Sequence, residues 1–318
     1  MNRTKIGLGL AALGRPEYIN LRSHDDPDKS IEAYRANALK VMDFAYEKGI
    51  RHFDTAASYG KGEQFLLDWN KKHGYNDVIL SSKWGYSYVA NWELDFKGQH
   101  EIKEHSLEKL IEQWGTAQKM LPALQLYQIH SATFESGVLE NTEVLLALDQ
   151  IRESTGVKLG ISVSGASQKD ILQTAFTMTI NNKKLFDSYQ VTYNVLEQSS
   201  FGILKKIMAD GKTVIIKEAL ANGRLLENEK FKHYAATYAF LKELSKKYGV
   251  GMDAIALRFI MDHLAPQLVL SGASSTVQLA QNIKAIHFKL SPNEVSQLKF
   301  LAIKPGQYWK ERSLLFWH

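Results

Sequence analysis

The feature that most constrains this chain is a regular alternation of short apolar, β-branched segments with longer amphipathic ones. Such an alternation is typical of repeated β–α units. The segments with strand character are Lys5–Leu10, Arg51–Thr55, Val78–Ser82, Leu124–Ile129, Lys158–Val163, Ser188–Thr192, Thr213–Lys217 and Leu268–Ser271. Helical periodicity predicts helices over Ile31–Lys48, Ile102–Trp114, Val138–Glu153, Gln168–Thr179, Phe201–Ala209, Phe231–Tyr248, Met252–His263 and Thr276–Ile286. Eight such units without a Pro- or Gly-rich linker favour one α/β domain over residues 1–318, a closed (β/α)8 TIM barrel rather than an open doubly wound sheet.

Composition constrains the cell compartment and the kinds of partner that we expect for this protein. The 318 residues include no cysteine, which rules out disulfides and thiolate metal sites, and the net charge is only +5. No apolar run approaches the ~20 residues that span a bilayer, and the N-terminus lacks the apolar core of a secretory signal. We therefore expect a cytoplasmic protein with no membrane or nucleic-acid partner. The sequence gives no indication of the oligomeric state.

Two connections and the tail are longer than barrel loops usually are. Leu13–Ser30 and Trp84–His100 suggest lids or substrate walls, and the tail Lys304–His318 is rich in aromatic residues. Within the second connection, Trp84, Tyr86 and Trp92 are candidates for an aromatic substrate-binding wall, and packing that holds a long loop explains them equally well. No third partner stands at metal-ligand spacing from His100 and His105, so we expect no metal.

Ionisable side chains stand at the ends of three successive predicted strands. Asp54 ends the second strand, Lys83 follows the third, His130 follows the fourth, and Tyr59 lies on the loop after Asp54. Because the carboxyl ends of barrel strands meet at the catalytic face, we expect these four groups to share one pocket. Taken singly, Asp54 and Lys83 are more simply a structural ion pair, Tyr59 a half-buried aromatic and His130 a core histidine. Their joint placement favours an active site.

The four residues form a coherent acid–base set. A phenol has a pKa of ~10, and a nearby ammonium favours the phenolate, so we expect Lys83 to lower the pKa of Tyr59. Asp54 would pair with Lys83, and His130 would hydrogen-bond a substrate oxygen or share the proton relay. Tyr59 is then the group that donates a proton.

These residues in their settings, GIRHFDTAASYG, LSSKWG and LYQIH, resemble the aldo-keto reductase superfamily over nearly the whole chain. The resemblance implies a (β/α)8 barrel that binds a nicotinamide dinucleotide and transfers hydride to an aldehyde, ketone or sugar carbonyl, or from the alcohol. Carbonyl reduction needs hydride at carbon and a proton at oxygen, and no metal or nucleophile. The alternatives are a cofactor-bound regulatory or scaffold subunit with little turnover, and a lyase that uses Lys83 as a Schiff base.

The same resemblance assigns residues to the cofactor. Ser162 and Gln190 would bind the nicotinamide carboxamide, Lys217 stands where an aromatic residue often stacks on the ring, and Leu220, Asn222, Gly223 and Arg224 belong to the pyrophosphate loop. The helix start after the last strand supplies Gly272, Ala273, Ser274 and Gln278 for the 2′-phosphate, with Gln281 and Asn282 for the adenine. The resemblance makes NADP(H) the first expectation. NAD(H) is a competitor, because Gly272 and Gln278 stand where the family commonly has a lysine or arginine for the 2′-phosphate.

Overall fold

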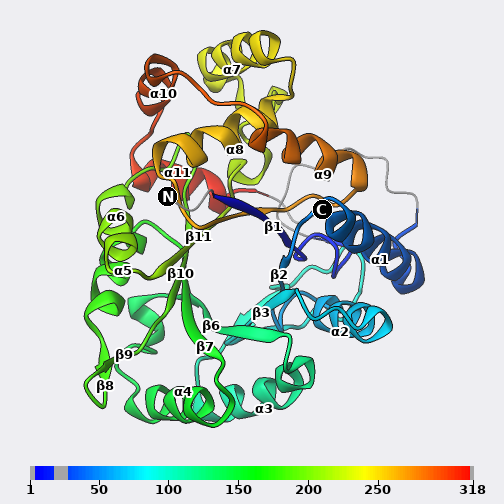
Figure 1. Ribbon diagram of the computed structural model, residues 1–318, viewed down its shortest axis with the longest axis vertical. Helices are drawn as coiled ribbons and strands as arrows, with labels where there is room; N and C mark the ends of the chain where they lie inside the picture. Colours follow the sequence, from blue (N-terminus) through cyan, green and yellow to red (C-terminus); the bar gives the residue numbers. More distant parts are fainter. Residues whose placement is uncertain (1–3, 18–27, 316–318) are drawn as a thin grey trace.

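Eight parallel strands close into a barrel in the computed structural model, which describes residues 4–17 and 28–315 (Figure 1). Their order around the barrel is β1-β12-β11-β10-β7-β6-β3-β2. The strands are β1 (Lys5–Gly9), β2 (His52–Asp54), β3 (Ile79–Trp84), β6 (Leu124–Ala132), β7 (Lys158–Val163), β10 (Ser188–Thr192), β11 (Thr213–Lys217) and β12 (Leu268–Ser271). Each coincides with one of the segments of strand character. The predicted (β/α)8 barrel is therefore confirmed.

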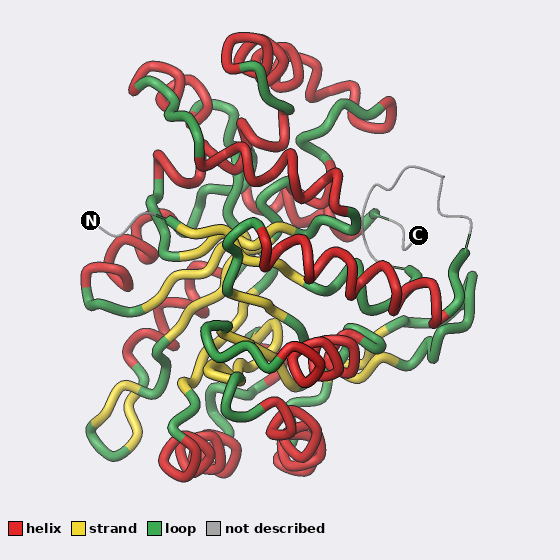
Figure 2. Tube along the Cα trace, turned by 45° about the vertical axis from the view of Figure 1, so that its right-hand side comes forward, coloured by secondary structure: helices red, strands yellow, loops and turns green. Residues whose placement is uncertain are grey.

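Helices surround the barrel (Figures 1 and 2). They are α1 (Ile31–Glu47), α2 (Gly62–His73), α3 (Leu107–Ala117), α4 (Thr142–Thr155), α5 (Gln168–Thr177), α6 (Phe201–Ala209), α7 (Ala235–Tyr248), α8 (Met252–His263), α9 (Thr276–Ile283), α10 (Pro292–Lys299) and α11 (Pro305–Ser313). Short 3-10 helices cover Gln118–Met120, Phe134–Ser136, Ala221–Gly223, Glu229–Tyr234 and Lys284–Ile286. Among the described helices, none is long and apolar enough to cross a membrane.

Helix α1 illustrates how the sequence sets these elements. The Ser30 side chain accepts a hydrogen bond from the backbone N–H of Ala33, which satisfies one of the donors left over at a helix start. Ala38, Val41 and Ala45 recur at three- and four-residue spacing and are buried. Burying this stripe fixes the helix against the barrel, between α2 and α9.

Several boundaries differ from the sequence-based prediction. Helix α2 was not predicted, because its apolar stripe is limited to Phe65, Leu66 and Trp69 in an otherwise polar segment. The predicted helix over Ile102–Trp114 begins later, at Leu107, where Ser106 caps it, and strand β5 (Glu101–Lys103) precedes it. In the tail, the Lys304–His318 segment contains α11, and Phe316 and Trp317 lie outside the described residues.

The connection after β3 is a folded element and not an open loop. Strands β4 (Tyr86–Tyr88) and β5 (Glu101–Lys103) pair in antiparallel register, with Tyr86 opposite Lys103. A second hairpin, β8 (Thr179–Ile180) with β9 (Lys183–Lys184), projects from the side of the barrel (Figure 2). The β4–β5 hairpin covers one edge of the barrel mouth. Of the other long connection, residues 18–27 lie outside the described part of the chain.

Candidate active site

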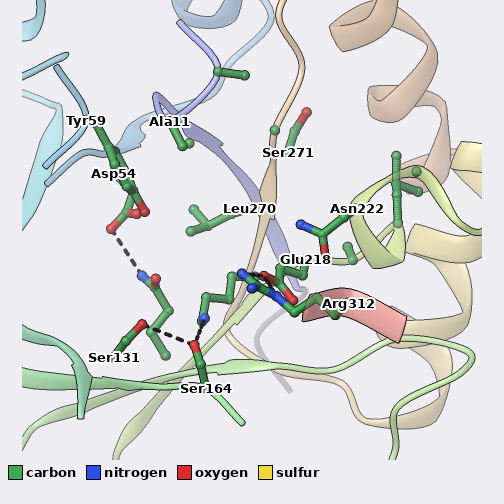
Figure 3. Close-up of a pocket in the computed structure, with 18 of the residues that line it drawn as sticks. Ala11, Asp54, Tyr59, Ser131, Ser164, Glu218, Asn222, Leu270, Ser271 and Arg312 are labelled. Carbon is green, nitrogen blue, oxygen red and sulfur yellow. Dashed lines mark hydrogen bonds and ion pairs between the residues drawn. The ribbon is translucent and has the colours of Figure 1, made fainter. Parts of the chain in front are cut away.

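A cavity of about 670 Å³ opens at the carboxyl ends of the strands (Figure 3). It begins among Asp54, Tyr59 and His130, passes the loop after β11, and ends between α8 and α9 at Asp253 and Asn282. Its volume is in the range of small-molecule and cofactor pockets. The predicted convergence of strand ends therefore produces a single elongated site rather than scattered polar groups.

Asp54 and Lys83 form a fully buried ion pair under the cavity floor. The Lys83 Nζ lies 2.6 Å from Asp54 Oδ2 and donates a second bond, of 2.7 Å, to the carbonyl oxygen of Thr55. The other carboxylate oxygen of Asp54 accepts bonds from the Ser81 hydroxyl (2.7 Å) and from the side-chain amides of Gln190 (3.1 Å) and Gln128 (3.3 Å). Buried charges require such partners, so this pair is locked in one geometry.

Tyr59 stands above this pair and beside His130. The Lys83 Nζ is 4.7 Å from the centre of the Tyr59 ring, and the rings of Tyr59 and His130 meet edge to face at 5.6 Å. Burial, followed by the charges of Asp54 and Glu101, raises the pKa of Tyr59 well above its usual value. The prediction that Lys83 lowers this pKa is therefore wrong, because burial disfavours the phenolate and Asp54 neutralises the ammonium.

His130 is held in its neutral form. Burial and the charges of Lys83 and Lys217 lower its pKa well below the usual value. Its Nδ1 is 3.5 Å from the Ser58 hydroxyl, and its carbonyl oxygen is 3.0 Å from Nε2 of the buried His105. A neutral imidazole can donate an N–H hydrogen bond to a substrate oxygen without giving up its proton.

The loop that carries Tyr59 packs directly on Gly14, in the loop after β1. A Cβ on Gly14 would lie 2.1 Å from the Tyr59 carbonyl oxygen and 2.8 Å from the backbone of Gly62. We expect Gly14→Ala to lower the free energy of unfolding by about 1–3 kcal/mol, because both obstacles are backbone atoms, and to reduce kcat by displacing Tyr59. Urea unfolding and steady-state rates would measure this. Gly115→Ala, whose added Cβ meets no atom within 4 Å, is the control; it should preserve kcat and keep or slightly raise stability, because Gly115 lies in helix α3.

Most residues predicted to bind the cofactor line the cavity. They are Gln190, Lys217, Leu220, Asn222, Gly223, Gly272, Ala273, Gln278 and Asn282. Ser162 is fully buried just behind the wall, where its hydroxyl accepts the backbone N–H of Ser131. Ser274 and Gln281 are not among the lining residues, and the Ser274 hydroxyl is bonded to the Gln278 side chain.

Arg224 requires a correction, since its guanidinium does not line the cavity. The side chain is fully buried, donates to the carbonyl oxygens of Ala221 and Tyr308, and lies 3.4 Å from Glu311. The central carbon of its guanidinium group lies 4.1 Å from the centre of the Tyr308 ring. Arg224 thus anchors α11 against the loop after β11 instead of reaching for a pyrophosphate.

The proposed aromatic wall is also corrected. Trp84 is fully buried and packs edge to face on His105 at 5.5 Å, and Trp92 packs on Tyr34 while its Nε1 donates to the carbonyl oxygen of Lys29. Both therefore hold loops together. Tyr86 alone of the three lines the cavity, with its ring 4.9 Å from that of His130.

Sequence reasoning missed several polar residues of the cavity wall. Arg312 on α11 binds Glu218 with Nε at 2.9 Å and Nη2 at 2.7 Å (Figure 3). Although burial raises it, Arg312 and Lys217 lower the pKa of Glu218 to about 2. Glu218 could have been noticed as the neighbour of Lys217 in KEALANG, whereas the position of Arg312 depends on how α11 folds back.

The shape of the cavity fits a dinucleotide. One continuous space links the groups around Tyr59 with the start of α9, where Gly272 leaves open space. Between these ends, Glu218, Ala221 and Asn222 all have φ near +50°, a conformation that costs free energy outside glycine and is concentrated at ligand-binding loops. The residues present therefore fit a long cofactor.

Fold and site together define a (β/α)8 barrel with ionisable side chains gathered in one cavity at the strand ends, the place where barrel enzymes carry their active sites. The chain matches the Aldo/keto reductase family over residues 5–303, and it belongs to that family. Members are NAD(P)H-dependent oxidoreductases that act on small-molecule carbonyl compounds, which is the general activity of this chain.

Several curated proteins and solved structures are distantly similar to this chain. The chain is 22% identical to the uncharacterized oxidoreductase YqkF of Bacillus subtilis (85% of this chain, 89% of that protein) and 24% identical to norsolorinic acid reductase of Emericella nidulans (83% and 72%). Among solved structures, the aldo-keto reductase AKR11C1 from Bacillus halodurans superposes with a TM-score of 0.70 at 20% identity, covering 96% of this chain and 94% of that one. The structural likeness supports the fold alone.

Proposed function

We propose that the protein reduces aldehydes or ketones to alcohols, with Tyr59 as the general acid and, in the reverse direction, the general base. The observation that carries the proposal is the placement of Tyr59 and His130 in one cavity, over the buried Asp54–Lys83 pair. A carbonyl that accepts hydride at carbon needs a proton at oxygen, and Tyr59 is the hydroxyl next to the other three groups. The name of one relative, a probable aryl-alcohol dehydrogenase of Saccharomyces cerevisiae, supports aromatic carbonyl compounds as first test substrates.

Each residue has a distinct part in this mechanism. When bound, the nicotinamide cofactor supplies the hydride. The raised pKa of Tyr59 keeps the phenol protonated at neutral pH, so the proton is in place when negative charge develops on the carbonyl oxygen. Neutral His130 orients that oxygen, and the Lys83 ammonium stabilises the phenolate that forms. The test is oxidation of NADPH or NADH in the presence of an aldehyde panel, with rates above the substrate-free control expected.

The end of the cavity near α9 bears on the preference between NADP(H) and NAD(H). Family resemblance favours NADP(H), yet the residues that line the cavity there include Gln278, Asn282 and Asp253. A 2′-phosphate gains little from neutral amides and is repelled by a carboxylate. We propose that NADP(H) is used, with an advantage over NAD(H) of less than about tenfold in affinity.

Titration of the intrinsic tryptophan fluorescence with NADPH and NADH would measure this difference. Trp309 lines the cavity and provides a local reporter. Asp253→Asn should shift the ratio further toward NADPH, because it removes the repulsion and keeps the side-chain volume. A wild-type preference of a hundredfold or more, unchanged in Asp253→Asn, would contradict the proposal.

A further inference from the structure

One buried arginine connects the loop that carries Tyr59 to two other segments at the cavity mouth. Arg15 follows β1 and is fully buried, and its Nη1 donates to the Ser58 carbonyl oxygen at 3.1 Å and to Glu101 Oε1 at 2.9 Å. The Ser58 carbonyl belongs to the peptide bond that precedes Tyr59. Arg15 therefore holds the backbone at the point where the phenol is attached.

The residue before Arg15 holds the same loop on the other side of Tyr59. The backbone N–H of Lys61 donates to the Gly14 carbonyl oxygen at 2.7 Å, and a Cβ on Gly60 would lie 2.8 Å from the Cβ of Arg15. The two segments are thus in direct contact, with one hydrogen bond before Tyr59 and one after it. The loop of the phenol cannot shift without breaking these bonds.

Glu101 brings the β4–β5 hairpin into this contact. It lies on β5 opposite Tyr88 of β4 and lines the cavity, and its side chain is 17% exposed. The central carbon of the Arg15 guanidinium lies 5.9 Å from the centre of the Tyr59 ring and 5.6 Å from that of Tyr88, distances at which a cation is attracted to a ring. One arginine therefore joins the loop after β1, the Tyr59 loop and the hairpin.

Arg15 and Glu101 also place opposite charges beside the phenol. Burial is the largest cause of the raised pKa of Tyr59, and the charges of Asp54 and then Glu101 add to it. The charge of Arg15 acts in the opposite direction and favours the phenolate. Among the described residues, the charged or titratable groups that face this phenol belong to different elements of the barrel: Arg15 after β1, Asp54 on β2, Lys83 on β3, Glu101 on β5, His130 on β6 and Glu218 after β11.

We propose that Arg15 and Glu101 are positioning residues for the reaction, which hold Tyr59 at the cavity and balance the charge beside its hydroxyl. This inference rests on the proposed function and adds to it two residues that act through Tyr59. The alternative is an ion pair that only ties the hairpin to the barrel. The two roles can be separated, because the members of the pair have opposite charges and a purely structural tie does not depend on the sign of the charge that is removed.

Glu101→Gln removes the negative charge and keeps an oxygen that can accept the bond from Arg15. The measurement is the rate of alcohol oxidation at about pH 8, where Tyr59 acts as the base and the rate rises with the fraction of phenolate. Loss of the Glu101 charge should lower the pKa of Tyr59 by about one pH unit, and by Brønsted behaviour should raise the oxidation rate about threefold. A rate equal to or below that of the wild type would overturn the proposal.

Arg15→Met removes the positive charge and the bond to Ser58, so alcohol oxidation should fall about tenfold or more. Arg152→Met is the matched control, because Arg152 also binds a carboxylate, of Asp149, and the carbonyl oxygens of Lys184 and Leu185, away from the cavity. Urea unfolding should show lower stability for both variants, whereas only Arg15→Met should lose activity. An unchanged rate in Arg15→Met would contradict a positioning role.

The same substitution in a Tyr59→Phe background separates this inference from the proposed function. If Glu101 acts through the phenol, Glu101→Gln should have no effect on the residual rate of Tyr59→Phe. A threefold increase that persists without the phenol would overturn the inference and leave the proposed function intact. Full activity of Tyr59→Phe alone would instead reject the proposed function, together with every role that acts through Tyr59.

Discussion

Replacing Tyr59 by Phe is expected to lower kcat/KM by about 10²–10⁴-fold for every carbonyl substrate, the usual contribution of a general acid. The substitution removes one oxygen and retains the ring, which packs on His130 and lies over Lys83. Cofactor affinity should change less than about twofold, because the loss is confined to proton transfer. Steady-state rates and fluorescence titration on the same preparation would separate the two effects.

The control for this substitution is Tyr127→Phe. Tyr127 is a fully buried tyrosine of β6 that does not line the cavity, and its hydroxyl has no hydrogen-bond partner among the described residues. Removing that hydroxyl should leave turnover unchanged and preserve or slightly raise stability, since a buried unpaired hydroxyl is costly. Full activity of Tyr59→Phe would show that Tyr59 is not the general acid, and His130 would then be the next candidate for that role.

The barrel could be predicted because each of its β–α units has its own local sequence pattern, and the pattern repeats along the chain. Each strand is a short apolar run, as in Lys158–Val163, and each helix carries a periodic apolar stripe, so errors in one unit do not affect the others. Helix α2 was missed where a polar segment buries few residues. The β4–β5 hairpin was missed because it lies inside a polar connection without a turn signal of its own.

In the candidate site, only the residues at strand ends could be placed from the sequence. Asp54, Lys83 and His130 follow from topology alone, since parallel strands deliver their last residues to one face. The roles of Arg224 and Arg312 depend on α11, which folds back from the end of the chain, and a sequence pattern does not encode that contact. The pKa of Tyr59 was predicted with the wrong sign because burial and the neutralising carboxylate of Asp54 appear only in three dimensions.

Asp54 and Lys83 provide the test that separates structural from catalytic roles. Asp54→Asn should lower the free energy of unfolding by about 3–5 kcal/mol, because it leaves the Lys83 ammonium buried without a counter-charge, bonded only to neutral oxygens. Lys83→Met should cost less, since the Asp54 carboxylate keeps the donors of Ser81 and Gln190. Urea unfolding would measure both, with Glu229→Gln, in an exposed pair with Lys232, as the control that changes little.

The double variant Asp54→Asn/Lys83→Met gives the sharpest result of this series. It removes both charges together, so stability should recover by most of what Asp54→Asn lost, whereas kcat should stay at or below the level of either single variant. Recovered folding with absent turnover would show that Lys83 acts on the Tyr59 phenolate and does more than hold the barrel together. Recovery of turnover along with stability would instead assign the pair a purely structural role, and the transition state would then need another cation.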